Sequence, residues 1–247
     1  QASWKPPVLA SPAPSEGRRL VLQADISQVL SKLDPSPASR RAVELTSWRP
    51  NWNILGHVRT TNAVSSLELK RRDLLLKGVG PEASALLYGT QWLVGKPGIP
   101  FRHFVAQPPS PQGWVEYQSQ EAPKLVRCST KFAAVASAEE ALDRVKRGEP
   151  VVEAAVPSQN EGGEVPCELA RLGDASFRVT SAPVETPLLV RVSESYLPGW
   201  SATAAGGTGL PVFASDVAFV GTVAPARSTE LTFSYRPPHL APMLGVS

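Results

Sequence analysis

The sequence predicts an α+β protein in which a mixed α/β N-terminal part is followed by an antiparallel β-sandwich of jelly-roll type. Three observations favour this class. The helical patterns of apolar residues end before residue 150. From Glu164 onward the chain reads almost entirely as short strands, separated by turn residues at a spacing of about 8–12 positions. The chain also contains 25 prolines, which favour loops and strand edges over long helices.

The composition divides the chain into four segments. Residues 1–17 are rich in Pro, Ser and Ala and form a linker. We expect the mixed α/β domain at 18–160 and the β-sandwich domain at 161–237, with the boundary near residue 160. Residues 238–247 turn apolar and are expected to begin a membrane-proximal segment.

The first elements follow from short patterns. Arg19–Ala24 is a candidate strand, and Asp25–Leu33 is an amphipathic helix because its apolar residues recur at helical spacing. Ala42–Leu45 is a second strand. A helix begins at Ser65, which makes an S-x-x-E capping box with Glu68.

The middle of the chain alternates between regular and irregular segments. A short helix runs from Pro81 to Tyr88 with Gly89 as its C-cap, and Gln91–Val94 is a buried strand. Residues 96–124 contain prolines at 97, 100, 108, 109, 111 and 123 and are expected to be irregular.

The strongest helix signal covers Ser137–Arg147. Ser137 and Glu140 form a capping box, an apolar stripe follows, and basic residues stand near the negative end of the helix dipole. The stripe consists of Ala141, Leu142 and Val145. Strands are predicted around it at Leu125–Cys128, Phe132–Val135 and Val151–Ala155.

The sandwich strands alternate apolar and polar residues. Val165, Cys167 and Leu169 alternate with Glu164, Pro166 and Glu168. Further strands are predicted near Phe177–Val179, Leu188–Val192, Ser201–Ala205, Leu210–Ala214, Ala218–Ala224 and Thr229–Tyr235, with a Gly-rich hairpin at 206–209.

Charge and motif content argue against several function classes. The net charge is only +3 and the basic residues are scattered in pairs and triplets, so we expect no nucleic-acid partner. No Cys/His spacing fits a zinc site, and neither a P-loop nor a G-x-G-x-x-G occurs, so we expect no metal and no cofactor. Ser193-Glu194-Ser195 could suggest a serine nucleophile. It has no neighbouring histidine and no nucleophile elbow, so we do not expect serine hydrolase chemistry.

The two cysteines leave two alternatives open. Cys128 and Cys167 form one bridge in an oxidising compartment, or they are two buried, unpaired thiols. The sequence does not decide between them.

Two aromatic segments are candidate glycan-binding sites. Trp48 and Trp52 stand with Arg49, Asn51, Asn53 and His57, and this set offers stacking faces with amides and a guanidinium to bind sugar hydroxyls. The alternative is a loop that its tryptophans dock onto the core. Tyr196 and Trp200 flank the Pro198-Gly199 turn, where the alternative is that Trp200 fills the sandwich core.

The C-terminal third resembles the last extracytoplasmic domain of the YfhO-like family of bacterial multi-pass membrane proteins, which are related to glycosyltransferases that use lipid-linked sugars. The resemblance rests on Tyr196-Leu197-Pro198-Gly199-Trp200, the glycine turn and Phe233-Ser234-Tyr235-Arg236-Pro237. The segments at 49–55, 68–72 and 86–94 are similar to further family elements. The chain departs from the family at Asn62-Ala63, where members usually have Gly-Tyr, and at the hairpin turn 206–209, where many have Asp-Gly.

The resemblance implies a module facing the periplasm or cell surface, attached to the inner membrane through segments outside this chain. Gln1 in place of a methionine agrees with that expectation, as it does with a secreted protein whose signal peptide was removed. Because the family's catalytic carboxylate lies in a membrane-domain loop, we expect no catalytic residue here. The expected role is to recognise or position an envelope glycan or lipid acceptor, with the chain's own membrane domain or the bilayer and a glycan or polyprenyl-phosphate sugar as partners. The alternative is a secreted or periplasmic sandwich that binds carbohydrate or a protein.

Overall fold

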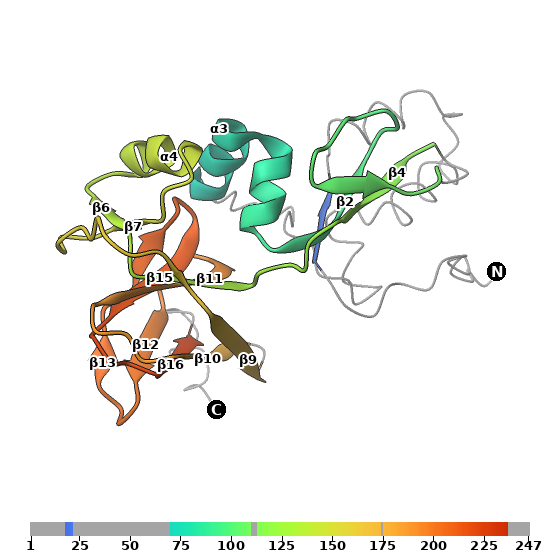
Figure 1. Ribbon diagram of the computed structural model, residues 1–247. Helices are drawn as coiled ribbons and strands as arrows, with labels where there is room; N and C mark the ends of the chain where they lie inside the picture. Colours follow the sequence, from blue (N-terminus) through green and yellow to red (C-terminus); the bar gives the residue numbers. More distant parts are fainter. Residues whose placement is uncertain (1–17, 22–69, 110–112, 174, 237–247) are drawn as a thin grey trace, which may run out of the picture. The chain divides into compact units, whose positions relative to one another are not determined.

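The computed structural model describes residues 18–21, 70–109, 113–173 and 175–236 (Figure 1). Within them the chain forms two compact units. Unit 1 contains residues 18–21 and 81–123, and unit 2 contains residues 70–80 and 124–236. No helix in these residues has the length and apolar character needed to cross a membrane.

Unit 1 is built on a four-stranded sheet, sheet A, in the order β1-β2-β4-β3. β1 is parallel to β2, and the other pairs are antiparallel. β1 and β2 occupy two of the positions predicted to be strands, whereas the helix predicted at 25–33 and the strand predicted at 42–45 lie outside the described residues. The strands are β1 (Arg18–Val21), β2 (Thr90–Gly95), β3 (Phe104–Ala106) and β4 (Val115–Ser119).

The prediction that residues 96–124 are irregular is wrong, because β3 and β4 both lie there. The six prolines fall outside these two strands, at positions before β3, between β3 and β4, and after β4. In β4, Val115 and Tyr117 are each only 2% exposed, and they alternate with polar residues as a half-buried strand requires. The Tyr117 hydroxyl donates to the Lys96 carbonyl at 2.6 Å, which holds the loop after β2.

Helix α3 (Lys70–Leu87) consists of two helical segments separated at Gly80, whose φ of 80° and ψ of 170° are not helical. The second segment begins at Pro81, where the missing N–H costs no helical hydrogen bond. It ends before Gly89, which adopts the left-handed conformation with φ 60°. The start and end predicted for this helix are confirmed, whereas the capping box predicted at Ser65 lies outside the described residues.

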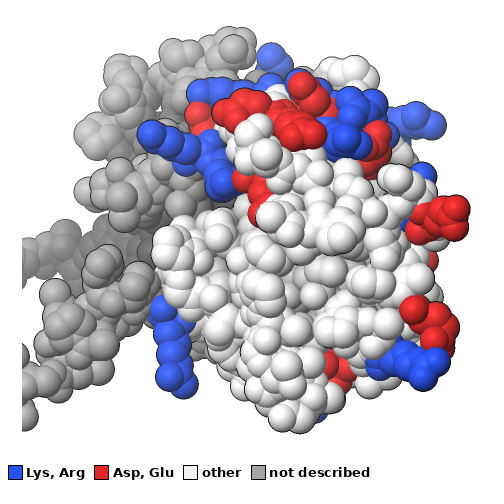
Figure 2. Space-filling model, turned by 90° about the vertical axis from the view of Figure 1, so that its left-hand side faces the viewer, with Lys and Arg blue, Asp and Glu red and all other residues white. Residues whose placement is uncertain are grey.

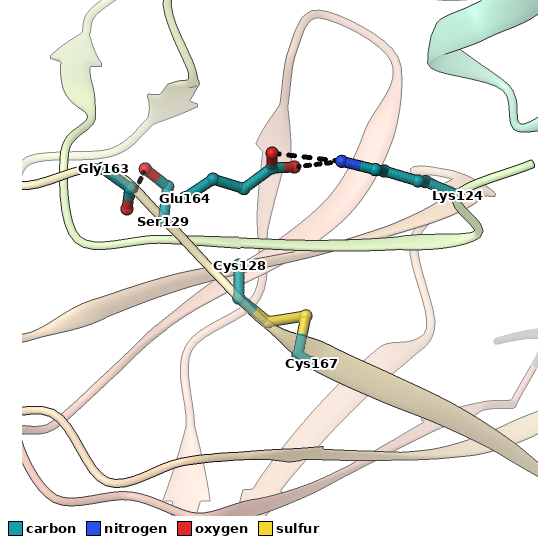
Figure 3. The surroundings of a disulfide bond; sticks show 6 residues. All are labelled: Lys124, Cys128, Ser129, Gly163, Glu164 and Cys167. Carbon is teal, nitrogen blue, oxygen red and sulfur yellow. Dashed lines mark hydrogen bonds and ion pairs between the residues drawn. A yellow bond between two sulfur atoms is a disulfide. The ribbon is translucent and has the colours of Figure 1, made fainter. Parts of the chain in front are cut away.

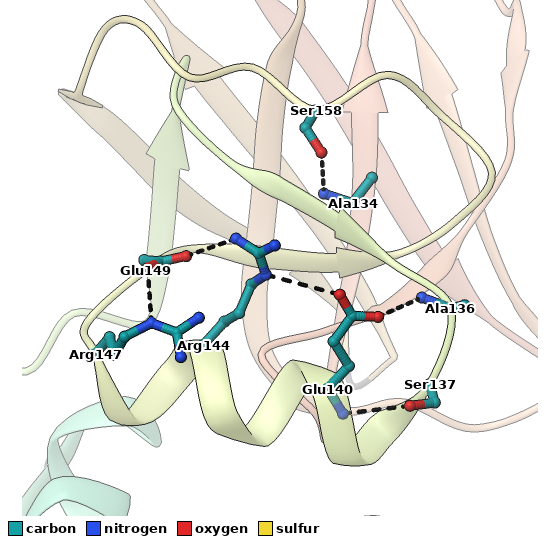
Figure 4. A network of polar contacts seen from close by, with 8 residues as sticks. All are labelled: Ala134, Ala136, Ser137, Glu140, Arg144, Arg147, Glu149 and Ser158. Atoms are coloured by element: carbon teal, nitrogen blue, oxygen red, sulfur yellow. Dashed lines mark hydrogen bonds and ion pairs between the residues drawn. The ribbon is translucent and has the colours of Figure 1, made fainter.

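Helix α4 (Ala138–Lys146) begins and ends as its sequence predicts (Figure 4). The Ser137 hydroxyl accepts a hydrogen bond from the Glu140 backbone N–H at 3.2 Å. The Glu140 carboxylate in turn accepts from the Ala136 N–H, one residue before the expected partner of a capping box. Ala141 and Leu142 are buried, and this stripe faces β6 and β7.

Unit 2 contains a seven-stranded sheet, sheet B, and a five-stranded sheet, sheet C. Sheet B has the order β6-β7-β14-β15-β11-β5-β8 and is antiparallel except between β6 and β7. Its strands are β5 (Val126–Ser129), β6 (Ala133–Val135), β7 (Val151–Glu153), β8 (Glu164–Val165), β11 (Leu188–Ser195), β14 (Phe213–Ser215) and β15 (Phe219–Ala224).

Sheet C is fully antiparallel, in the order β13-β12-β16-β10-β9. Its strands are β9 (Cys167–Gly173), β10 (Ser176–Ser181), β12 (Trp200–Ala204), β13 (Gly209–Leu210) and β16 (Glu230–Tyr235). The hairpin between β12 and β13 turns at Gly206 and Gly207, both with φ 84°.

The two sheets share one apolar core. Val190 and Val220 of sheet B pack with Phe177 and Phe233 of sheet C, and each of the four is at most 2% exposed. Burying one such side chain stabilises the fold by about 1.5–3 kcal/mol. The predicted class, an α+β chain with an antiparallel β-sandwich, is confirmed.

At two of its crossings between the sheets, the chain has a proline directly after the last residue of the strand that it leaves. Pro166 separates β8 of sheet B from β9 of sheet C, and Pro211 lies between β13 of sheet C and β14 of sheet B. A proline has no N–H to donate to a ladder, so the strand stops there and the next residues pair elsewhere. The single strand predicted at Leu210–Ala214 is therefore two strands in different sheets.

The expected domain boundary near residue 160 falls within unit 2, because β5, β6, β7 and β8 pair in the same sheet as β11, β14 and β15.

A disulfide between Cys128 of β5 and Cys167 of β9 links the two sheets near the first of these crossings (Figure 3). Beside it, Lys124 forms an ion pair with Glu164 at 3.1 Å, and the Ser129 hydroxyl donates to the Gly163 carbonyl at 3.2 Å. These contacts attach β8 to the edge of β5.

Candidate functional site

The candidate glycan-binding residues fall into two groups. Tyr196 and Trp200 are described, and both are half-buried on either side of the Pro198-Gly199 turn between β11 and β12. The candidate site is therefore built around this pair. The others lie outside the described residues: Trp48, Arg49, Asn51, Trp52, Asn53 and His57.

Trp200 stands at the end of the sandwich core, in a row of aromatic rings. Its ring stacks on Phe177 with the centroids 6.0 Å apart, and it lies 5.2 Å from the ring of Tyr235. The indole N–H donates to the Ser195 carbonyl at 3.0 Å, so the buried polar edge of the ring is satisfied. Trp200 and Tyr235 each keep part of their surface open to solvent.

An ion pair continues this row at the edge of sheet C. The Arg171 guanidinium lies 4.8 Å from the centroid of the Phe177 ring and 3.7 Å from the Glu194 carboxylate. The two side chains are 32% and 28% exposed, so both stay partly open to solvent. We call Phe177, Trp200, Tyr235, Arg171 and Glu194 the aromatic end of the sandwich.

The strand register explains why these residues meet. Arg171 pairs with Phe177 across β9 and β10, and Trp200 pairs with Tyr235 across β12 and β16. Directly paired residues of antiparallel strands point to the same face of the sheet. Glu194 comes from sheet B, where the register between β11 and β15 shifts between Val192 and Ser195.

Tyr196 is held by two contacts within unit 2. Its backbone N–H donates to the Ala218 carbonyl at 2.8 Å, and the Arg71 guanidinium lies 5.8 Å from the centroid of its ring. Arg71 also donates to Glu153 at 2.8 Å and to the Val217 carbonyl at 3.0 Å. The hydrogen bond to Glu153, which favours the charged guanidinium, raises the pKa of Arg71.

A second ion pair of unit 2, between Arg191 and Asp216, is buried. Arg191 donates to the Asp216 carboxylate at 2.9 Å, and their side chains are 2% and 9% exposed. The Arg191 guanidinium also lies 4.5 Å from the centroid of the Phe219 ring and donates to the Ser193 hydroxyl at 3.1 Å. This hydroxyl, considered above as a nucleophile, therefore serves a buried polar network.

One face of unit 2 has a marked distribution of charge (Figure 2). Charged side chains of both signs gather over α4, which has acidic residues in its first turn and basic residues in its last turn, and a wide area below them is uncharged. Within unit 2, residues 195–226 contain a single charged residue, the buried Asp216. Partners that bind through phosphates need clustered Lys and Arg, and this face, among its described residues, does not offer such a cluster.

Sequence reasoning missed most of the charged residues around Tyr196 and Trp200. Nothing in the local pattern marks Arg71, Glu153, Arg171 or Glu194, because their partners come from distant elements. The sequence predicted Tyr235 only as a strand residue. Tyr235 belongs to the aromatic end because it pairs directly with Trp200 across β12 and β16.

Comparison with known proteins finds similarity to solved structures of arabinofuranosyltransferase AftD from Mycobacteria. One is 26% identical over 33% of this chain and 6% of that chain, with a TM-score of 0.28. A structure of a mutant is 24% identical over 33% of this chain, with a TM-score of 0.28, and another of the same mutant is 18% identical over 50%, with a TM-score of 0.27. The chain spans 6 to 7% of the length of these structures. No protein-family profile and no curated protein matches the chain.

Proposed function

We propose that this chain is a non-catalytic extracytoplasmic domain of a glycosyltransferase-like membrane protein, and that it helps to recognise or position a glycan or lipid acceptor of the cell envelope. The observation that carries the proposal is the aromatic end of the sandwich, where two partly exposed rings stand beside a partly exposed ion pair.

This arrangement suits a sugar ring. The C–H groups of a sugar pack on an aromatic face, and Trp200 and Tyr235 supply two neighbouring faces. Sugar hydroxyls both donate and accept hydrogen bonds. Arg171 can only donate and the Glu194 carboxylate can only accept, so the pair complements them. Ligand sites commonly combine apolar walls with a few polar groups of this kind.

The extracytoplasmic location is supported by the disulfide between Cys128 and Cys167. Disulfides persist in oxidising compartments and are rare in the cytosol. The attachment to a membrane domain and the use of a polyprenyl-phosphate sugar by that domain are proposed from the resemblance of the Tyr196–Trp200 and Phe233–Pro237 segments to the YfhO-like family.

The alternative, a secreted or periplasmic sandwich that binds carbohydrate or a protein without an attached transferase, would be favoured by a stripe of exposed aromatic rings across a sheet. Among the described residues the large apolar side chains that are exposed are Val105 and Leu172, and neither is aromatic. We therefore place the membrane-attached domain first.

Glycan binding can be tested by NMR on the ¹⁵N-labelled chain. The indole signal of Trp200, assigned with Trp200→Phe, is followed while neutral and uronic-acid-containing envelope oligosaccharides are added one at a time. We expect at least one oligosaccharide to shift this signal. Glu194→Gln, which keeps the shape and loses the charge, should weaken that binding about tenfold, since a hydrogen bond to a charged group contributes about 1.5–3 kcal/mol.

Val105→Ala is the control, because it removes an exposed apolar side chain of unit 1. If no oligosaccharide shifts the Trp200 signal, or if Val105→Ala weakens binding as much as Glu194→Gln, the aromatic end is not the glycan site. The location is tested separately by adding a membrane-impermeant maleimide to intact cells. Cys167, which is partly exposed, should be labelled only after reduction, and labelling that requires cell lysis would contradict an extracytoplasmic domain.

A further inference from the structure

Two consecutive residues beside Tyr196 have a backbone conformation that is unfavourable for their side chains. Asp216 has φ 44° and Val217 has φ 75°, in the left-handed region. Val217 is β-branched and fully buried, and a positive φ is a genuine outlier for such a residue. Such strain persists only where the surrounding contacts hold it.

The contacts that hold this turn come from three elements. The Asp216 carboxylate accepts from the Val151 N–H of β7 at 2.9 Å and from Arg191 of β11 at 2.9 Å, and its own N–H donates to the Val151 carbonyl at 3.0 Å. Val217 is held by a different residue. Its carbonyl accepts from Arg71 of α3 at 3.0 Å.

The turn leads directly to Tyr196. Ala218, the next residue, accepts the Tyr196 N–H at 2.8 Å, and the Arg71 guanidinium also faces the Tyr196 ring. Tyr196 begins the segment that turns at Pro198-Gly199 and reaches Trp200. Arg71 thus contacts this segment twice, once through the strained turn and once through the ring.

We propose that Arg71 is a positioning residue: anchored by Glu153, it holds the strained turn and the Tyr196 ring, and so sets the conformation of the segment that carries Trp200. Glu153 is suited to anchor it because its carboxylate accepts from both terminal nitrogens of the guanidinium and its side chain is only 11% exposed. The part of this proposal that concerns a ligand rests on the proposed function, and the part that concerns the Tyr196 segment does not.

The first test needs no ligand. Amide hydrogen exchange is measured by NMR on the full chain and on Arg71→Gln, which cannot form the charged bonds to Glu153 and Val217. We expect exchange at the Tyr196 N–H to accelerate about tenfold and the Trp200 indole signal to move, which corresponds to the loss of one charge-assisted hydrogen bond. Lys77→Gln is the matched control, since Lys77 lies on the same helix and its ammonium group forms an ion pair with Asp73 at 2.6 Å, four residues away. Unchanged exchange at Tyr196 in Arg71→Gln overturns the proposal. If Arg71→Gln does not fold, Glu153→Gln removes the anchor instead and the same signals decide.

The second test uses the oligosaccharide that shifts the Trp200 signal of the wild-type chain. Arg71→Gln should raise its dissociation constant about tenfold, and Arg71→Lys should do nearly the same, because a lysine cannot bridge Glu153 and the Val217 carbonyl as a guanidinium does. Wild-type affinity in Arg71→Lys would show that Arg71 acts by its charge alone and would overturn the positioning role. If no oligosaccharide binds the wild-type chain, the proposed function fails, while the exchange experiment still decides the role of Arg71.

Discussion

Cys128 and Cys167 form a disulfide that joins the two sheets of the sandwich, with 6.2 Å between their Cα atoms and 39 residues of separation in sequence. Cys128 is fully buried, and both cysteines pack in the core that the sheets share. The bridge lies next to Pro166, where the chain leaves sheet B for sheet C, so it fastens the sandwich at a point where no strand ladder connects the sheets.

Removing this bridge should destabilise unit 2 strongly. For a closed loop of this length the chain-entropy model gives a loss of about 4 kcal/mol in the free energy of unfolding for Cys128→Ala/Cys167→Ala. Chemical denaturation of the oxidised chain, the reduced chain and the double variant measures it. The reduced chain and the variant should lose similar amounts, and a reduced chain as stable as the oxidised one would contradict the role assigned to the bridge.

Replacing Asp216 with alanine should be among the most damaging single changes in the described part of unit 2. Arg191 would remain buried without its carboxylate partner, and the Val151 N–H would lose its acceptor. Breaking a buried pair on one side costs about 3–5 kcal/mol. The exposed pair between Arg227 and Glu185 is the comparison, because both side chains are about three-quarters exposed.

Glu185→Ala should change the free energy of unfolding by less than about 1 kcal/mol. Thermal and urea denaturation of both variants measures the difference. Equal losses in Asp216→Ala and Glu185→Ala would mean that burial of the Arg191–Asp216 pair has no energetic consequence.

The fold class followed from the sequence because its signals are local. The helix at 138–146 has its cap, its stripe and its terminal basic residues within one short segment, and strands such as β10 and β16 alternate apolar and polar residues. The two sheet changes at prolines did not follow. A proline ends a strand whether the chain continues in the same sheet or crosses to another, so Pro211 could not reveal that β13 and β14 lie in different sheets.

The site could be predicted only in part, for a related reason. Tyr196 and Trp200 are neighbours in sequence and share a turn motif. Arg71 contacts Tyr196 from 125 positions away in the sequence, and Arg171 at the edge of sheet C contacts Phe177, and both contacts depend on register and docking. β4 was not predicted, because the prolines on either side of this short alternating segment favoured an irregular loop.

A methyl group at Gly78 should push α3 and α4 apart. A Cβ at this position would lie 2.5 Å from Leu142 Cδ2, and Leu142 is only 7% exposed and has little freedom to move. Gly78→Ala should therefore cost about 1–3 kcal/mol from overpacking, offset by up to about 1 kcal/mol of better helix propensity.

Denaturation of Gly78→Ala in the wild-type and Leu142→Ala backgrounds separates the two effects. In the Leu142→Ala background the clash is absent, so Gly78→Ala should become neutral or stabilising. Gly163→Ala is the control, because a Cβ there meets nothing within 4 Å. The same cost of Gly78→Ala in both backgrounds would rule out Leu142 as the cause.

The end of α4 should show a pH dependence through Glu149 (Figure 4). Hydrogen bonds from Arg147 at 2.9 Å and Arg144 at 3.0 Å hold the pKa of this carboxyl below its ordinary value of 4.5. Because the folded-state pKa is lowered, the stabilisation is fully present above the ordinary pKa and is lost as the pH falls through the lower folded value.

A ¹³C NMR titration of the Glu149 carboxyl measures this pKa, and Arg147→Gln should raise it toward the ordinary value. Lys146→Gln should leave it unchanged, since that ammonium pairs with Asp143 at 3.2 Å. Equal titration curves for wild type and Arg147→Gln would show that Glu149 does not depend on the arginine.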